Sequence, residues 1–153
     1  MPKKMRALFL APLLALGLAV GAAAPASAAG PWDGTDPQNT GCAANALTRW
    51  STTLVDPRTG AAVGTMEVRW SRTCQTNWVR VDNWIPGAQV HMSIDRVGGP
   101  YGSASGSLTE SYTGTVWSNQ VYAPGTTCVH VGTQITKGGQ HVGSSGQSPA
   151  IVC

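Results

Sequence analysis

Oxygen-bearing side chains gather in the sequence WDGTDPQNTG, which spans residues 32–41. Asp33, Asp36 and Asn39 are of the type that binds calcium, which takes carboxylate and amide oxygens in glycine-containing loops. The segment lacks the regular alternation and the late bidentate glutamate of a calcium loop, however. Asp and Asn also cap turns by accepting hydrogen bonds from their own backbone. We therefore expect turn-forming residues here, with no metal and no cofactor.

Catalytic and zinc chemistry find little support elsewhere in the chain. His91, His130 and His141 are widely spaced, and the cysteines of an exported chain are better used as disulfides than as zinc ligands. The sequence GSASG at residues 102–106 has Ala104 where a nucleophilic serine would stand on a sharp turn. No pair of carboxylates stands out for glycoside cleavage. We expect a protein that is not an enzyme.

Tryptophans offer a sharper hypothesis, because an indole ring can stack on a sugar while its N–H stays hydrated. The run VRWSRTCQTNWVRVDNW at residues 68–84 carries three of the six tryptophans. Strand alternation predicts that Trp70 faces the core and that Trp78 faces outward beside Arg80. The candidate binding residues are Trp78, Arg80, Trp84, Trp117 and Arg72.

Arg72 supports a different class of function. It precedes Cys74 by two residues, so a disulfide-braced loop could present its side chain to a trypsin-like protease. A rigid loop loses little entropy when it docks, which suits an inhibitor. A protease-inhibition assay, repeated with Arg72→Ala, separates this alternative from a binding module.

The first 28 residues have the pattern of a secretory signal peptide. Basic residues precede an apolar run, and Ala26-Ser27-Ala28 provides a cleavage site that would leave Ala29 as the first mature residue. Cleavage would remove three of the ten basic residues and leave seven of each charge. A neutral chain with Lys137 as its single lysine is a poor ligand for nucleic acid. We expect a secreted protein without a membrane span in its mature chain.

The mature chain would have four cysteines, Cys42, Cys74, Cys128 and Cys153. An even number in an exported chain predicts two disulfides. Three pairings are possible. We favour Cys42 with Cys74 and Cys128 with Cys153, because each pair closes a moderate loop that is worth about 3 kcal/mol against the unfolded chain.

Alternating apolar residues and Pro-Gly turns predict an all-β domain over residues 29–153. We expect a small, disulfide-stabilised antiparallel sandwich or barrel of about seven strands. Residues 137–149 are rich in glycine and serine and predict a loop. The expected strands cover residues 46–55, 62–71, 77–81, 88–97, 105–112, 115–122 and 127–135.

Three segments stand out together: DGTDPQNTGCA from Asp33, GTMEVRWSRTCQTNWVRV from Gly64 and WSNQVYAPGTTC from Trp117. In this order they resemble one family, a small secreted domain of unknown function from actinobacteria. Family members look like DGxDPxxTGCA, VELRxSPxCxTNWxRV and MVYAP, although Arg72 stands where proline is common. Some relatives resemble the outer part of membrane-tethered regulators, which implies an extracellular sensing or binding role.

These observations predict a non-catalytic interaction module that acts outside the cell or at the cell envelope. Its partner would be an extracellular protein or a cell-wall glycan, and we expect a monomer. A protease inhibitor that uses Arg72 and a glycan-binding module that uses exposed tryptophans remain the alternatives.

Overall fold

The structure is a computed structural model, which describes residues 30–98, 106–111, 113–146 and 150–153. The expected signal peptide and the sequence GSASG up to Ser105 lie outside these residues. The described chain contains strands and turns and no helix. The strands are β1 (Leu47–Val55), β2 (Ala62–Ser71), β3 (Thr76–Asn83), β4 (Gln89–Arg96), β5 (Gly106–Ser111), β6 (Gly114–Trp117), β7 (Val121–Tyr122), β8 (Val129–Lys137), β9 (Gln140–Ser144) and β10 (Ala150–Val152).

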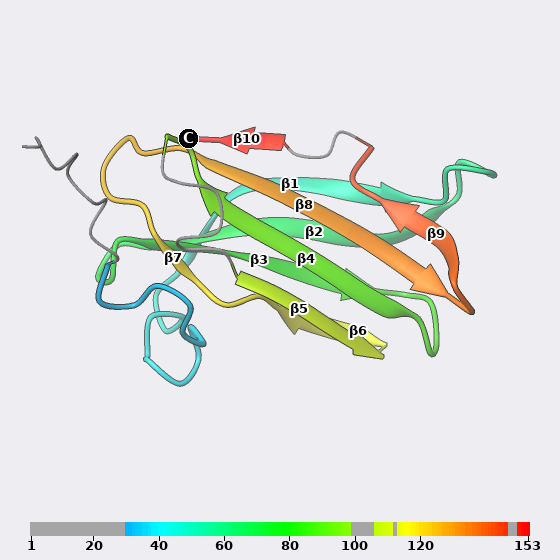
Figure 1. The fold of residues 1–153 in the computed structure, drawn as a ribbon, viewed down its shortest axis with the longest axis horizontal. Helices are drawn as coiled ribbons and strands as arrows, with labels where there is room; N and C mark the ends of the chain where they lie inside the picture. The colour runs from blue at the N-terminus through cyan, green and yellow to red at the C-terminus, as the bar shows by residue number, and fades with distance from the viewer. Residues whose placement is uncertain (1–29, 99–105, 112, 147–149) are drawn as a thin grey trace, which may run out of the picture.

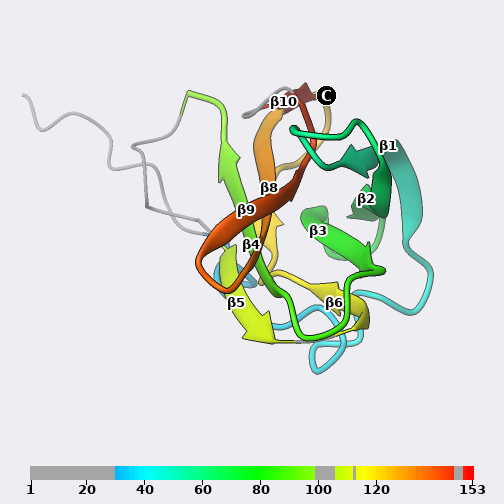
Figure 2. The ribbon, with the colours of Figure 1, turned by 90° about the vertical axis from the view of Figure 1, so that its right-hand side faces the viewer.

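All ten strands belong to one antiparallel sheet that curls into a nearly closed barrel (Figures 1 and 2). The strand order is β5-β4-β8-β9-β1-β2-β3-β6, while β10 pairs with β8 and β7 pairs with β3. The prediction of an all-β, disulfide-stabilised barrel is confirmed. Each expected strand has a counterpart. The strand expected at residues 115–122 is divided into β6 and β7 by residues 118–120.

The interior of the barrel is filled by the inward-facing residues of β2, β3, β4 and β8. Alternation along β2 and β3 follows the predicted pattern, since cross-strand partners Met66 and Val81 are both fully buried. Val90 and Ile135 are paired and buried in the same way on β4 and β8. One continuous apolar core results, and partly buried Trp50 packs against it.

The loop between β1 and β2 is held by Asp56. Its carboxylate accepts hydrogen bonds from the Arg58 backbone N–H (2.8 Å) and from the Arg58 guanidinium (3.0 and 3.2 Å). The side-chain hydrogen bonds from Arg58, followed by the one from its backbone, lower the pKa of the Asp56 carboxyl. Gly60, with a φ of 72°, completes the turn that the sequence DPRTG predicted.

The chain after β8 corrects one prediction. Residues 137–149 were expected to form a loop, but they contain β9, which forms a hairpin with β8. Gly138 and Gly139 supply the positive φ angles of the turn. Val142 is buried, and Gly143 lies so close to Val63 and Ile135 that a Cβ there would meet them at 2.7 and 3.2 Å. Glycine therefore serves close packing here as well as the turn.

Both expected disulfides are present. Cys42 is bonded to Cys74, and Cys128 is bonded to Cys153. The second bond fastens the end of β10, which pairs with the first three residues of β8. The described residues contain no free cysteine.

Candidate functional site

The chain between Gly30 and Ala46 lies outside the barrel wall and is fastened to it at several points. We call residues 30–46 the N-terminal segment. The Cys42–Cys74 disulfide joins it to the turn between β2 and β3. The guanidinium of Arg69 on β2 donates a 2.7 Å hydrogen bond to the carbonyl of Ala46. The N-terminal segment therefore lies against the outer side of β2 and β3.

Gln120, in the link between β6 and β7, is the buried centre of this attachment. Its Oε1 accepts a 2.6 Å hydrogen bond from the hydroxyl of Thr76 on β3. Its amide Nε2 donates to the hydroxyls of Thr35 (3.0 Å) and Thr40 (2.8 Å) in the N-terminal segment. One amide group thus uses both its donor and its acceptor capacity to connect three parts of the chain.

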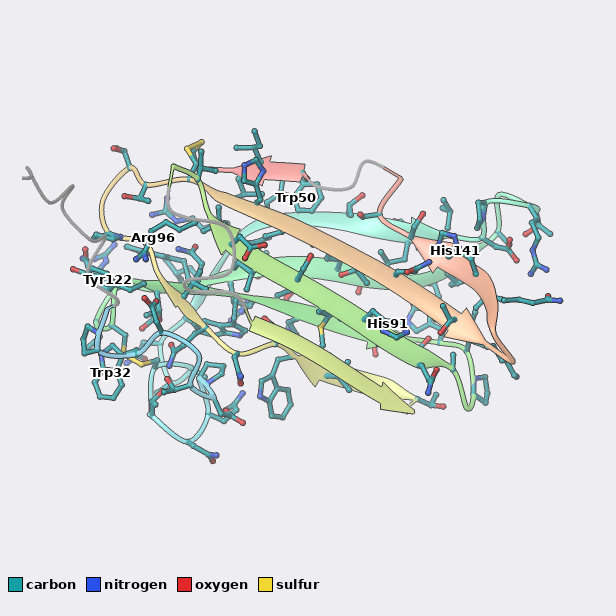
Figure 3. All side chains as sticks on the ribbon, viewed as in Figure 1. Trp32, Trp50, His91, Arg96, Tyr122 and His141 are labelled. Atoms are coloured by element: carbon teal, nitrogen blue, oxygen red, sulfur yellow. A yellow bond between two sulfur atoms is a disulfide. The ribbon has the colours of Figure 1, made fainter. Side chains whose placement is uncertain are left out.

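Asp33 is a second attachment point, and its carboxylate is almost fully buried. It accepts hydrogen bonds from the backbone N–H groups of Gly30 (2.7 Å) and Tyr122. Arg96 at the end of β4 lies 3.6 Å from it and also donates a 2.8 Å hydrogen bond to the Tyr122 carbonyl. Figure 3 places Trp32, Arg96 and Tyr122 together at one end of the barrel. Gly30 contacts Tyr122 so closely that a Cβ would lie 2.2 Å from the Tyr122 Cβ.

Asp36 caps the turn that follows. Its Oδ1 accepts from the backbone N–H groups of Gln38 (2.6 Å) and Asn39 (3.3 Å) and from the indole of Trp117 (3.3 Å). Asp36 therefore caps its local turn, as the turn-capping interpretation predicted, whereas Asp33 also bonds to the distant backbone of Tyr122. Within the described residues no group of three His, Cys, Asp or Glu side chains is placed to hold a metal ion.

Burial of Trp78 is the main correction to the predicted site. We expected this side chain to face outward, but only 2% of its surface is exposed. Trp78 does lie on the outer face of β3, because its neighbours Asn77 and Val79 alternate with it and Val79 belongs to the core. The N-terminal segment covers this outer face near Thr76. The outer face of β3 is therefore buried there, as the inner face is. A rule of strand alternation cannot anticipate a segment that docks from outside.

Trp70 is more exposed than predicted, whereas Trp78 is less exposed. It shares the inward face of β2 with Val68, yet it is only half-buried because it lies near the end of the barrel. The guanidinium of Arg49 on β1 lies 4.1 Å from the centroid of its ring. This cation–π contact covers part of the ring.

Three more candidate residues, Arg80, Trp84 and Trp117, lie on β3 or next to it. Trp84 continues the alternation of Arg80 and Asp82, and its indole donates a 2.9 Å hydrogen bond to the Asp82 carboxylate. Trp117 on β6 is the direct cross-strand partner of Arg80. Arg80 also pairs with Glu67 on β2 at 2.6 Å. We call these five residues, Glu67, Arg80, Asp82, Trp84 and Trp117, the Trp84 face.

The Trp84 face combines an exposed ring with two acidic side chains and one basic side chain. Trp84 is 49% exposed, although its ring orientation is fixed by the hydrogen bond to Asp82. The Arg80 side chain is 42% exposed beside it. Arg80 is therefore paired with Glu67, while Asp82 accepts the hydrogen bond from the Trp84 indole. Such a surface can stack on a flat apolar ligand and donate or accept hydrogen bonds around it.

Arg72 lies away from this face, on the turn between β2 and β3. The turn is closed by a 2.8 Å hydrogen bond from the Gln75 N–H to the Ser71 carbonyl, and Gln75 has a positive φ of 57°. Arg72 and Thr73 are exposed on this compact turn, next to the Cys42–Cys74 disulfide. The histidines are placed separately: His91 contacts the hydroxyl of Thr136 (3.2 Å) and His141 contacts the carbonyl of Gly143 (2.8 Å).

The three sequence motifs therefore meet at one end of the barrel. The first supplies Asp33, Asp36 and Cys42, the second supplies Cys74 and Thr76, and the third supplies Gln120. The residues that these motifs supply are therefore the ones that attach the N-terminal segment to the barrel. Sequence reasoning missed Gln120, although its position inside the third motif was a signal.

A family model described as Protein of unknown function (DUF2690) matches residues 31–130, which include all three motifs. No curated protein and no solved structure matches the chain. In the part of the chain that the structure describes, no helix is long and apolar enough to cross a membrane.

Proposed function

We propose that this chain, which belongs to the DUF2690 family of proteins of unknown function, is a non-catalytic interaction module that acts outside the cell or at the cell envelope. The Trp84 face would be its binding surface. A cell-wall glycan is the ligand class that this surface fits best, and the module would act as a monomer.

Export is supported by the signal pattern of residues 1–28 and by the two disulfides. Disulfides persist in oxidising compartments and are rare in the cytosol. The second bond fastens a three-residue strand, β10, which pairs with the start of β8. A domain built in this way is suited to conditions in which thiols are oxidised.

The observation that carries the proposal is the fixed exposure of Trp84. A large aromatic side chain in water normally gains from burial, and nearly half of this one is left exposed. Its indole is nevertheless held by Asp82, so little rotational freedom remains to be lost when a ligand binds. Trp117 is held in the same way by Asp36. The face is preorganised for stacking.

The chemistry around the rings favours a sugar over a nucleic acid. Arg80 is neutralised by Glu67, so phosphate would find little net positive charge. Sugar rings present apolar C–H faces for the indoles and hydroxyls that can bond to Arg80, Glu67 and Asp82. Neutral insoluble polymers of the cell wall and its surroundings offer this combination.

The test is cosedimentation of the oxidised, secreted protein with insoluble peptidoglycan, chitin and cellulose at low and high salt. The proposal predicts binding to one polymer that persists at high salt, because stacking is not screened by ions. Binding that disappears at high salt would show a nonspecific charge effect. Binding to none of the polymers would contradict the glycan assignment.

A protease assay checks the alternative at Arg72. Our proposal predicts that the protein leaves trypsin activity unchanged at every dose. Inhibition that depends on dose and disappears in Arg72→Ala would replace the glycan assignment with an inhibitor.

A further inference from the structure

The two tryptophans of the Trp84 face are separated along the direction of β3. Trp84 directly follows the last residue of β3, while Trp117 on β6 is the cross-strand partner of Arg80. The positions of Trp84 and Arg80 differ by four residues (84 minus 80). At about 3.3 Å per residue, Trp117 therefore lies roughly 13 Å from Trp84 along β3 and one strand spacing, about 4.8 Å, to its side.

The surface between the two tryptophans is polar and accessible to solvent. Asp82 lies midway along this stretch of β3, and its cross-strand partners are Thr65 on β2 and Thr115 on β6. Thr115 is exposed, and the other two are half-buried. Two hydroxyls and a carboxylate thus form a row halfway between the tryptophans. A ligand that reaches from one indole to the other would pass over this row.

The shape of the barrel determines the direction in which a long ligand can lie. The wall curves from one strand to the next, whereas each strand runs nearly straight (Figures 1 and 2). A stiff ligand laid across the strands would leave the surface, but a ligand laid along β3 stays in contact with it from Trp84 to Arg80. A disaccharide is shorter than this span. A longer chain of linked sugars can reach both indoles.

The charges beside this path favour an uncharged chain. Among the side chains that the structure describes, the cations nearest to the path are Arg69 and Arg80, which lie 3.7 and 2.6 Å from the Glu67 carboxylate. Neither cation is left without an acidic partner. Asp82, in the middle of the path, would repel an acidic group of the ligand. A chain with carboxylates or phosphates is therefore a poorer match than a neutral one.

We infer that the Trp84 face binds an extended, unbranched and uncharged polysaccharide chain that runs along β3. Trp84 and Trp117 stack on sugar rings at the two ends of the contact. Asp82 and Thr115 form hydrogen bonds with sugar hydroxyls between them. This inference rests on the proposed function, because it specifies the ligand of the same face. It adds Thr115 to the binding residues and makes affinity depend on chain length.

A length series tests the inference with the oxidised, secreted protein. Soluble oligomers of chitin and of cellulose, from the disaccharide to the hexasaccharide, are titrated and binding is followed by tryptophan fluorescence. In the series that binds, affinity should rise at least about fivefold from the disaccharide to the hexasaccharide, equivalent to about 1 kcal/mol of added stacking. Trp117→Ala should remove this gain and leave the affinity for the disaccharide unchanged, because the disaccharide occupies Trp84 alone.

A second variant serves if Trp117→Ala alters the fold, since the Trp117 indole also bonds to Asp36. Thr115→Arg places a long side chain in the path between the indoles. It should weaken hexasaccharide binding at least about fivefold and leave disaccharide binding unchanged. Thr53→Arg is the matched control, because Thr53 is exposed on β1, two strands from β3, and lies outside the path. It should change neither affinity.

The outcomes separate this inference from the proposed function. Polymer binding that depends on Trp84, combined with equal affinity for the disaccharide and the hexasaccharide, would overturn the extended site and leave the function intact. Equal effects of Thr115→Arg and Thr53→Arg, or polymer binding without binding of any soluble oligomer, would do the same. A carboxylated hexasaccharide of the same backbone that binds as tightly as the neutral one would overturn the selection by charge. Failure of every oligomer and polymer to bind would contradict both proposals.

Discussion

Replacement of Gln120 by leucine tests how the N-terminal segment is attached to the barrel. Gln120 is fully buried and makes three side-chain hydrogen bonds, one with Thr76, one with Thr35 and one with Thr40. Leucine fills a similar space but makes none of them. Each such bond contributes about 1 kcal/mol to stability, so Gln120→Leu should lower the free energy of unfolding by about 3 kcal/mol.

The hydrogen bonds also indicate which of the three threonines loses most when Gln120 is replaced. The hydroxyls of Thr35 and Thr40 retain carbonyl acceptors within the N-terminal segment, at Trp32 and Asp36. The hydroxyl of Thr76 loses the acceptor shown for it and is fully buried. An unpaired buried donor adds a desolvation cost. The loss of about 3 kcal/mol in the free energy of unfolding is therefore a lower estimate.

Urea unfolding followed by tryptophan fluorescence measures this change. A loss of about 3 kcal/mol corresponds to a fall of roughly 10 °C in the melting temperature of a domain of this size. Gln134→Leu is the matched control, because Gln134 is exposed on β8 and should change stability by less than about 0.5 kcal/mol. Equal effects of the two substitutions would refute the assigned role of Gln120.

A second variant at the same position adds a pH dependence with a defined sign. In Gln120→Glu, burial would raise the pKa of the new carboxyl in the folded state above its unfolded value of about 4.3. The folded variant would then be stabilised below that value and would lose stability as pH rises through the raised pKa. Stability measured from pH 4 to 8 should fall relative to wild type. A pH-independent difference would show that the site is accessible to water.

The remaining predictions concern the disulfide, the close backbone contacts and the β1–β2 turn. Removal of both Cys128 and Cys153 opens a loop with a sequence separation of 25 and should cost about 3.5 kcal/mol, with faster amide exchange in β10; unchanged exchange would contradict this. Gly64→Ala places a Cβ 2.5 Å from the Asp82 carbonyl, which is backbone, whereas Gly143→Ala meets the more adaptable Val63 side chain at 2.7 Å. Calorimetry should therefore find a larger loss for Gly64→Ala, of about 2–3 kcal/mol, and the reverse order would be inconsistent with the packing. Asp56 has a lowered pKa, so its contribution is present above the unfolded pKa and is lost as pH falls through the folded one. Melting curves from pH 2 to 6 should show that Asp56→Asn reduces stability at pH 6 and that the difference shrinks at pH 2.

The hairpin of β2 and β3 was predictable because its information is local. Met66, Val68, Val79 and Val81 alternate with polar residues, and the turn between the strands contains the cysteine of the first disulfide. The preferred disulfide pairing followed from loop length alone. Local alternation and short loops are properties that a sequence shows directly.

Trp78 was not predictable in the same way. Its outward direction on β3 followed from alternation, but its burial did not. On the same face of β3, Thr76 is connected through Gln120 to the N-terminal segment, which comes from a distant part of the sequence. β9 was missed for a related reason. Its glycines look like a loop, while Gly143 is needed for close contact with Val63 and Ile135. Both errors arise from contacts between distant parts of the chain, where tertiary packing overrides local preference.

The most direct test of the proposed function compares two exposed tryptophans. Trp84→Ala and Trp32→Ala each remove an exposed indole, but only Trp84 belongs to the Trp84 face. Affinity for the bound polymer should fall at least about fivefold in Trp84→Ala, equivalent to about 1 kcal/mol, and should stay within about twofold in Trp32→Ala, with both variants folded. Equal losses, or a loss in Trp32→Ala alone, would contradict the assignment of the binding surface to the Trp84 face.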